Sequence, residues 1–279
     1  MRIISSIAKM QQFALRARHK GFSVGFVPTM GALHEGHLSL IRRARKENDL
    51  VVLSIFVNPA QFGPKEDFKK YPRSLKEDSR LCRSCGVDVI FYPQAKAMYP
   101  PGYLTYVTVE KLSDKLCGRA RPGHFKGVAT VVTKLFNIVQ PTSAYFGQKD
   151  AQQSVIIRKL TADLNMPVKI KVLPTLRDKD GLALSSRNAY LNPKERREAL
   201  VLPQALKRAR SLIKRGVRDS AKIIAEMRGV IRSSGAARVD YISVVDTVNL
   251  EPLGLLRGDY LIALAARVGK TRLIDNITD

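Results

Sequence analysis

The sequence lacks any apolar run that could cross a membrane, because none of its hydrophobic stretches approaches the roughly eighteen residues that a spanning helix needs. A helical membrane protein is therefore not expected. The chain has 279 residues, of which 45% are hydrophobic. That length and composition suit a globular protein with two domains, or one large α/β domain with an appendage.

Cysteine is also scarce, with only Cys82, Cys85 and Cys117. The first two form a CxxC pair, which could be half of a zinc site or a redox motif. No histidine follows at zinc-finger spacing, and Cys117 has no second cysteine nearby. We therefore expect ordinary, partly buried thiols and a cytoplasmic location.

Acidic residues are few: 24 Asp and Glu stand against 48 Lys and Arg, which gives a net charge of +24. Such an excess attracts phosphates and raises the possibility of an RNA-binding protein. However, the basic residues extend along the whole chain without a long basic tail, and only 7% of residues are aromatic, with no stacking motif. The sequence thus favours a solvated basic surface over a nucleic-acid partner.

The first 34 residues contain no acidic side chain, a feature of transit peptides. The apolar spacing favours a different interpretation, an amphipathic helix with Ser5 or Ser6 as its cap. Gly21 would end this helix just before the first expected strand.

Strand-like and helix-like runs alternate up to Thr175, which predicts βαβ units and a Rossmann-like parallel sheet in a domain of residues 1–175. The expected strands are 25–28, 50–57, 87–92, 144–147 and 168–173, and the expected helices are 36–46, 74–85, 123–139 and 150–164. Ligands of such sheets bind beyond the carboxyl ends of the strands.

The pattern changes after Thr175, where helical runs come first and strands follow. The runs predict helices over 193–215 and 219–233 and strands over 238–245, 259–266 and 271–275. Residues 176–279 are therefore expected to form a smaller α+β domain.

The segment Met30-Gly-Ala-Leu-His-Glu-Gly-His37 follows an expected buried strand and begins an expected helix. Helix N-termini present unpaired N–H groups and partial positive charge, which suit a phosphate group. His34 and His37 stand three residues apart and can face one ligand. Metal binding by the two histidines is the alternative, but no third ligand has suitable spacing.

Polar residues follow two further expected strands. Asn58 and Gln61 flank Pro59 after an apolar run, and their amides fit a hydroxyl-bearing carboxylate. Lys149 offers a mobile charge to phosphates, while Asp150 could cap a helix or help to hold Mg²⁺. These groups, aimed at a phosphate and a second substrate, indicate nucleotidyl transfer.

A fourth polar element, Ser185-Ser186-Arg187, lies in a loop after Gly181. Two hydroxyls beside a guanidinium could close over a triphosphate. Taken alone, this element is weak evidence and would be interpreted as an ordinary surface loop, so its assignment depends on the other three elements.

With these elements in view, the chain resembles the pantothenate synthetase (pantoate–β-alanine ligase) family of the nucleotidyltransferase superfamily. The resemblance covers nearly the whole length. The motifs that carry it are FVPTMGALHEGH (26–37), FVNPAQF (56–62), YPR (71–73), RPGHFKGVAT (121–130), FGQKDAQQ (146–153) and LSSRN (184–188).

The resemblance implies an enzyme that condenses pantoate with β-alanine in two steps. The pantoate carboxylate attacks the α-phosphorus of ATP and forms pantoyl adenylate and pyrophosphate; the amine of β-alanine then attacks the acyl carbon and releases AMP. It further implies Mg²⁺ bound with the ATP, a homodimer, and a lid role for residues 176–279. The protein ligands of Mg²⁺ stay unknown, with Glu77 and Asp78 as nearby acids.

The family's functional residues map onto matching positions of this sequence. The implied catalytic residues are His34, His37, Lys149 and Arg187, with His37 as the proton donor. The implied ATP-binding residues are Met30, Gly31, Ala32, Leu33, His34, Glu35, Gly36, His37, Gly147, Gln148, Lys149, Asp150, Leu176, Leu184, Ser185, Ser186 and Arg187. Gln61 and Gln153 match the residues that bind pantoate, Gln61 also lies beside the β-alanine position, and Asn58 is expected to assist them.

Two positions depart from the family pattern, which commonly has Glu in place of Gln148 and Met in place of Leu184. The second exchange nearly conserves volume and should be mild. The first removes a charge beside Lys149, so we expect altered nucleotide affinity without loss of catalysis. A simpler nucleotidyltransferase is the nearest rival, but it has no use for Asn58 and Gln61.

Overall fold

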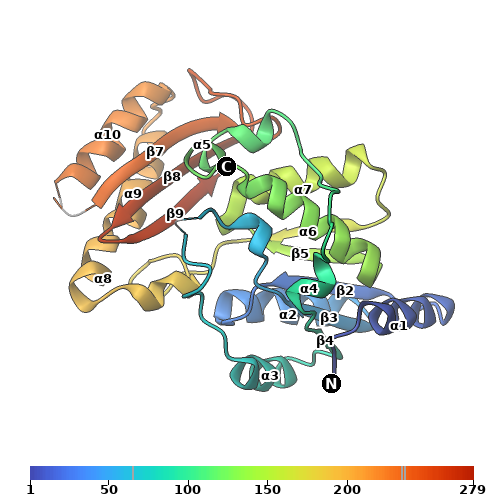
Figure 1. Ribbon diagram of the computed structural model, residues 1–279. Helices are drawn as coiled ribbons and strands as arrows, with labels where there is room; N and C mark the ends of the chain where they lie inside the picture. Colours follow the sequence, from blue (N-terminus) through green and yellow to red (C-terminus); the bar gives the residue numbers. More distant parts are fainter. Residues whose placement is uncertain (65, 234, 236) are drawn as a thin grey trace. The chain divides into compact units, whose positions relative to one another are not determined.

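A computed structural model describes residues 1–64, 66–233, 235 and 237–279 of the chain (Figure 1). The chain divides into two compact units, each described here by itself. The first unit comprises residues 1–114, 121–147 and 156–173, and the second comprises 115–120, 148–155 and 174–279. Two short inserts from the first two thirds of the sequence thus belong to the second unit.

The first unit is built on a six-stranded sheet in which every pairing is parallel. The strand order is β1-β4-β3-β2-β5-β6. The strands are β1 (Arg2–Ile4), β2 (Val24–Thr29), β3 (Leu50–Ile55), β4 (Val89–Phe91), β5 (Ser143–Gly147) and β6 (Lys169–Leu173). The predicted Rossmann-like parallel sheet is confirmed. The edge strand β1 was not expected, because three residues are too few to show a period.

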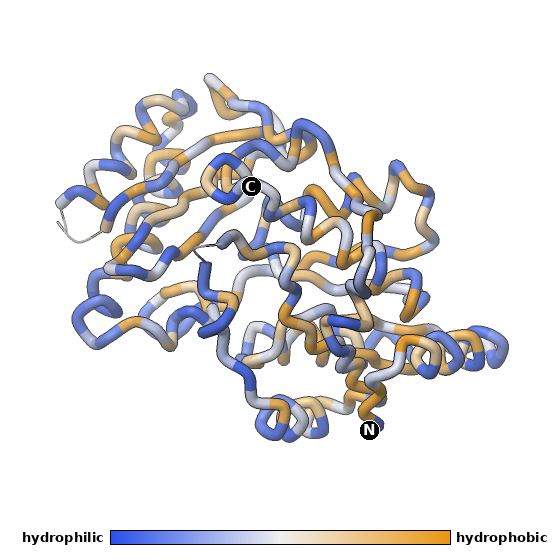
Figure 2. Tube along the Cα trace, in the orientation of Figure 1, coloured by the Kyte–Doolittle hydropathy of each residue, from blue (hydrophilic) through white to orange (hydrophobic). Residues whose placement is uncertain are grey.

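Helices connect the strands and cover the sheet. They are α1 (Ile7–His19), α2 (Glu35–Glu47), α3 (Leu75–Ser84), α4 (Ala95–Met98), α6 (His124–Val139) and α7 (Ala151–Asp163), the last of which passes from the second unit into the first. The side chain of Ser6 caps α1. Polar and apolar stretches alternate along α1, as a surface helix requires (Figure 2).

Strands β2 and β3 are buried almost throughout, so their sequences are continuously apolar rather than alternating. Thr29 pairs in register with Ile55 at the carboxyl ends of these strands. The chain therefore leaves the sheet at Met30 and at Phe56 from neighbouring points. These are the starts of the first two predicted functional segments.

The second unit contains an antiparallel sheet in the order β7-β8-β9, formed by β7 (Ala237–Asp246), β8 (Tyr260–Val268) and β9 (Thr271–Thr278). Its helices are α5 (Cys117–Ala120), α8 (Pro193–Ala199), α9 (Val201–Lys214) and α10 (Ser220–Arg232). Apolar residues of α9 and α10 form a core with alternate residues of the strands. The smaller antiparallel sheet agrees with the expected α+β architecture.

The single helix expected over 193–215 is wrong in one respect, since the structure breaks it at Leu200. Pro203 has no N–H to donate to the carbonyl of Ala199, so the series of helical hydrogen bonds is interrupted there.

Among the described residues, no helix is long and apolar enough to cross a membrane.

Candidate active site

The loop between β2 and α2 carries both predicted histidines. His34 is the N-cap of α2, and its Nδ1 accepts a hydrogen bond of 3.2 Å from the amide of Gly36. The amide of His34 in turn donates to Nδ1 of His37 at 3.3 Å. Because both Nδ1 atoms accept, each neutral ring carries its proton on Nε2. The rings are centred 4.1 Å apart. The loop thus presents two imidazole N–H donors at a helix N-terminus, which suits an anionic ligand.

The backbone that leads to these histidines adopts an unusual conformation. Gly31 has φ +83° and Ala32 has φ +51°, both in the left-handed region. A Cβ at Gly31 would lie 2.9 Å from the Asp78 carboxylate and 3.0 Å from Ile55. Glycine is therefore required at position 31 for its conformation and for the close approach of its neighbours.

Asp78 of α3 holds this strained loop. Its Oδ2 accepts from the amide of Ala32 at 3.0 Å, and its Oδ1 accepts from the amide of Leu33 at 2.8 Å. The side chain is buried, and burial raises the pKa of this carboxyl although the two amides oppose the shift. By contrast, Glu77 is exposed and pairs with Arg80. Asp78 thus positions the loop, a role that the sequence did not suggest.

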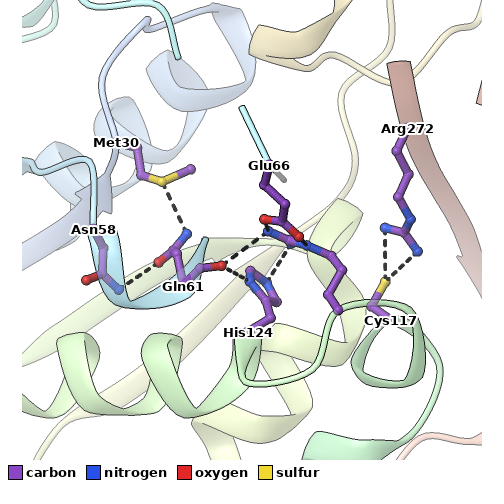
Figure 3. Close-up of polar contacts among 8 residues, drawn as sticks. Met30, Asn58, Gln61, Glu66, Cys117, His124 and Arg272 are labelled. Atoms are coloured by element: carbon purple, nitrogen blue, oxygen red, sulfur yellow. Dashed lines mark hydrogen bonds and ion pairs between the residues drawn. The ribbon is translucent and has the colours of Figure 1, made fainter. Parts of the chain in front are cut away.

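Asn58 is the N-cap of the short helix Pro59–Gln61 after β3, and Gln61 is the last residue of that helix (Figure 3). The Asn58 amide donates to Oε1 of Gln61 and to the carbonyl of Gly127, both at 3.0 Å. Gln61 donates to the sulfur of Met30 at 3.2 Å. Three predicted site residues are thereby joined, and Asn58, which is 1% exposed, orients the Gln61 side chain. Whether Asn58 also contacts substrate stays a prediction.

Helix α6 packs closely on this turn at Gly127. A Cβ at that position would lie 2.2 Å from the carbonyl oxygen of Ala60 and 2.6 Å from the amide nitrogen of Gln61. Only glycine lets the two backbones approach this closely. On the other side, the hydroxyl of Tyr99 donates to Oδ1 of Asn58 at 2.8 Å. The sequence signalled neither contact.

In the second unit, residues Gln148–Asp150 form a short helix before α7. Asn276 of β9 donates from its amide to the carbonyls of Gln148 and Lys149, both at 2.9 Å. Nε2 of Gln148 donates back to Oδ1 of Asn276 at 3.3 Å. Nζ of Lys149 lies 3.7 Å from the carboxylate of Asp150. Asn276 therefore fixes the course of the predicted phosphate-binding segment.

The other predicted ATP-binding segments of this unit lie side by side. The amide of Leu184 donates to the carbonyl of Leu176 at 3.0 Å, so the chain folds back on itself. Arg177 anchors the turn through a bidentate pair with Asp275, at 2.6 and 2.9 Å. Ser185 caps the short helix Ser186–Tyr190 by accepting from the amide of Arg187 at 3.2 Å. Residues eight apart in sequence thus become neighbours.

Gln153 lies half-buried on α7 in the second unit, one residue after a buried anchor. That anchor, Gln152, accepts from the amide of Cys117 at 2.9 Å and donates to the carbonyl of Lys115 at 2.7 Å. It binds the insert 115–120 to the start of α7.

The three cysteines are all free thiols. Burial, with smaller contributions from Asp78 and Cys85, raises the pKa of Cys82 to about 12, so this thiol stays protonated. Cys117 contacts the guanidinium of Arg272 within the second unit (Figure 3). It also contacts the hydroxyl of Tyr241 at 3.0 Å. Within the described ranges, no group of three His, Cys, Asp or Glu side chains could hold a metal ion.

The six-stranded parallel sheet and the smaller antiparallel sheet define a Rossmann-like α/β protein. The family model for Pantoate-beta-alanine ligase matches residues 2–278. Similar chains include the pantothenate synthetase of Heliobacterium modesticaldum, 57% identical over 277 residues, and that of Pelotomaculum thermopropionicum, 53% identical over 276. The alignments cover 99% of this chain in both cases, and 99% and 98% of the two relatives.

Solved structures agree. The pantothenate synthetase of Thermus thermophilus is 45% identical, with a TM-score of 0.95 and 99% coverage of both chains. The Francisella tularensis pantoate–β-alanine ligase, "Complexed with Beta-gamma ATP and Beta-alanine", is 38% identical, with a TM-score of 0.83 and coverage of 99% and 97%. The chain belongs to the pantoate–β-alanine ligase family. It is accordingly a ligase that joins pantoate to β-alanine.

Proposed function

We propose that the chain joins pantoate to β-alanine by way of an acyl adenylate. The pantoate carboxylate attacks the α-phosphorus of ATP, and the bond to the bridging oxygen breaks as pyrophosphate leaves. The amine of β-alanine then attacks the acyl carbon; AMP leaves, and the amine loses its proton. The observation that carries this proposal is the β2–α2 loop, in which two imidazoles at a helix N-terminus accept hydrogen bonds from backbone N–H groups at Nδ1.

In the first unit, His34 and His37 are assigned to the ATP phosphates, with His37 as proton donor to the departing pyrophosphate. Donors held in place before charge develops stabilise the transition state without reorganisation. The backbone of Met30–Leu33, which Asp78 holds, completes the nucleotide segment. Gln61 is assigned to pantoate and to the β-alanine position on the family resemblance, and Asn58 orients its side chain.

In the second unit, Lys149 and Arg187 are assigned to balance the phosphate charge. Gln148–Asp150, Leu176 and Leu184–Arg187 are assigned to ATP, with Leu176 beside adenine; Gly147, the last residue of β5 in the first unit, is assigned to ATP with them. The support is that Asn276 holds the first of these segments, while the others share one folded-back turn. Gln153 is assigned to pantoate on the family resemblance.

We include Mg²⁺ bound with the ATP. Such an ion is held mainly by phosphate oxygens and needs few protein ligands. Asp150, about half exposed, is a carboxylate of the nucleotide segments that could supply a protein oxygen. The ion would neutralise charge on the phosphates.

Three further properties rest on the family resemblance or, for the location, on the expected free thiols. They are a homodimeric assembly, a cytoplasmic location and a lid role for residues 176–279. We keep all three as predictions.

The deciding experiment is mass spectrometry of the products formed from ATP, Mg²⁺, pantoate and β-alanine. Pantothenate, AMP and pyrophosphate are expected in equal amounts. Isotope exchange between pyrophosphate and ATP should require pantoate and proceed without β-alanine. Exchange that is independent of pantoate would exclude the adenylate route.

A further inference from the structure

The main-chain carbonyl of Gln61 is held by two side chains that the proposed mechanism does not use (Figure 3). Nδ1 of His124 lies 2.8 Å from this oxygen, and Nη2 of Arg121 donates to it at 3.3 Å. His124 is the first residue of α6, and Arg121 lies three residues before it, so both are about sixty positions further along the chain. They hold the backbone of the residue whose side chain is assigned to pantoate.

The partners of His124 fix its protonation state. A carbonyl oxygen only accepts, so Nδ1 must carry a proton. Nε2 lies 2.9 Å from Nη1 of Arg121, and a guanidinium only donates, so Nε2 must offer its lone pair. His124 is therefore a neutral imidazole in the Nδ1–H form, the opposite tautomer to that of His34 and His37. A proton on Nε2 would bring this N–H donor against the N–H donor of Arg121 Nη1, and no hydrogen bond could form between them.

Glu66 holds the arginine that selects this tautomer. Its carboxylate accepts from Nε and Nη2 of Arg121 at 2.7 and 2.6 Å, a bidentate pair. Burial acts to raise the pKa of Glu66, but the hydrogen bonds and charge of Arg121 outweigh it, and the pKa is lowered. The carboxylate is thus ionised at neutral pH, and the guanidinium is fixed in orientation. Glu66, Arg121 and His124 form a relay that ends on the Gln61 carbonyl.

We propose that His124, locked by Arg121 and Glu66 in its neutral Nδ1–H form, is a positioning residue that places Gln61 for its carboxylate-bearing substrate. The inference rests on the proposed role of Gln61. His124 acts through the Gln61 backbone rather than on the substrate. Its loss should weaken pantoate binding while the nucleotide segments keep their own supports.

The test compares three substitutions of His124. His124→Ala removes the shorter of the two hydrogen bonds to the Gln61 carbonyl and leaves only that of Arg121. The KM for pantoate should rise by about tenfold, the effect of one hydrogen bond, while the KM for ATP changes less than about twofold. His124→Asn places an amide N–H at the position of Nδ1 and should restore the pantoate KM to within about threefold of the original. His124→Gln places its amide further out, near Nε2, and should resemble alanine. His19→Ala removes an exposed imidazole from α1 and should change neither constant.

Two outcomes would overturn the proposal: equal effects on both KM values in His124→Ala, or an asparagine variant no better than alanine. Nitrogen NMR of the unmodified protein gives a readout that needs no variant to fold. At neutral pH it should show a protonated Nδ1 and an unprotonated Nε2 for His124, and any other form contradicts the relay. If Gln61→Ala raises the pantoate KM but His124→Ala does not, only this inference fails. If the original protein forms no pantothenate, the proposed function itself fails.

Discussion

Replacing Gly127 with alanine would push apart the two backbones that meet beneath Gln61. The new Cβ would lie 2.2 Å from the carbonyl oxygen of Ala60, whereas ordinary contact begins near 3.4 Å. Because the obstacle is backbone rather than a flexible side chain, the turn and α6 must separate by roughly 1 Å. A shift of that size at a substrate-positioning residue can lower a rate by about a hundredfold.

We therefore expect kcat/KM for pantoate to fall by about a hundredfold in Gly127→Ala, measured from initial rates of AMP release with ATP saturating. Overpacking should also lower the free energy of unfolding by about 1–3 kcal/mol, measured by denaturant titration. A protein that keeps the original kcat/KM for pantoate would refute the view that this close approach places Gln61.

The matched control is Gly229→Ala in α10. This glycine is exposed, and an added Cβ there meets nothing within 4 Å. Alanine should raise the free energy of unfolding by about 0.5–1 kcal/mol because it favours the helix. Turnover should stay unchanged, so the two variants separate helix propensity from the displacement of Gln61.

Three other predictions concern the nucleotide segments. His37→Ala and Lys149→Ala should each slow adenylation by on the order of a hundredfold with the fold intact, and near-normal pyrophosphate exchange in either would disprove its assigned role. Asp78→Ala leaves two amides without their acceptor and should cost about 2–4 kcal/mol of unfolding free energy and raise the KM for ATP, whereas Glu77→Gln should do neither. Burial raises the pKa of Asp78 above its ordinary 3.8, so the folded state binds its proton more tightly. The contribution of Asp78 to the free energy of unfolding should therefore fall as the pH rises from 3.8 through the raised pKa. Denaturant titrations at several pH values should show this fall in the original protein and not in Asp78→Asn.

The parallel sheet could be predicted because its cause is local in the sequence. Strands buried on both faces must be apolar along their whole length, and the intervening helices show a different period. The segments after β2 and β3 then follow from topology, since neighbouring parallel strands end at one edge. The break at Leu200 could have been predicted too, because Pro203 removes the donor for the carbonyl four residues earlier.

The residues that hold the loops could not be predicted in the same way. Asp78, His124 and Asn276 lie between 45 and 128 positions from the groups they contact, and no pattern links such positions. Each bonds to main-chain atoms, which every residue possesses, so the partner's identity leaves no trace in the sequence. The motif around His124 stands out only as part of a family resemblance. The contact between His124 and the Gln61 carbonyl could be recognised only from the three-dimensional structure.

Main-chain contacts of this kind also explain how the segment 147–150 can accommodate glutamine where relatives commonly have glutamate. Asn276 holds the segment through the carbonyls of Gln148 and Lys149, and both bonds are independent of the side chain at 148. They use the amide of Asn276 as donor and leave its Oδ1 facing Nε2 of Gln148. A glutamate at position 148 would bring its carboxylate oxygen, an acceptor, against Oδ1 of Asn276, which is also an acceptor. Glutamine instead donates a hydrogen bond from Nε2 to Oδ1 of Asn276. The exchange of glutamate for glutamine thus removes a charge beside Lys149 but adds a hydrogen bond to Asn276. We expect the loss of this charge to change nucleotide affinity and to leave the course of the loop unchanged.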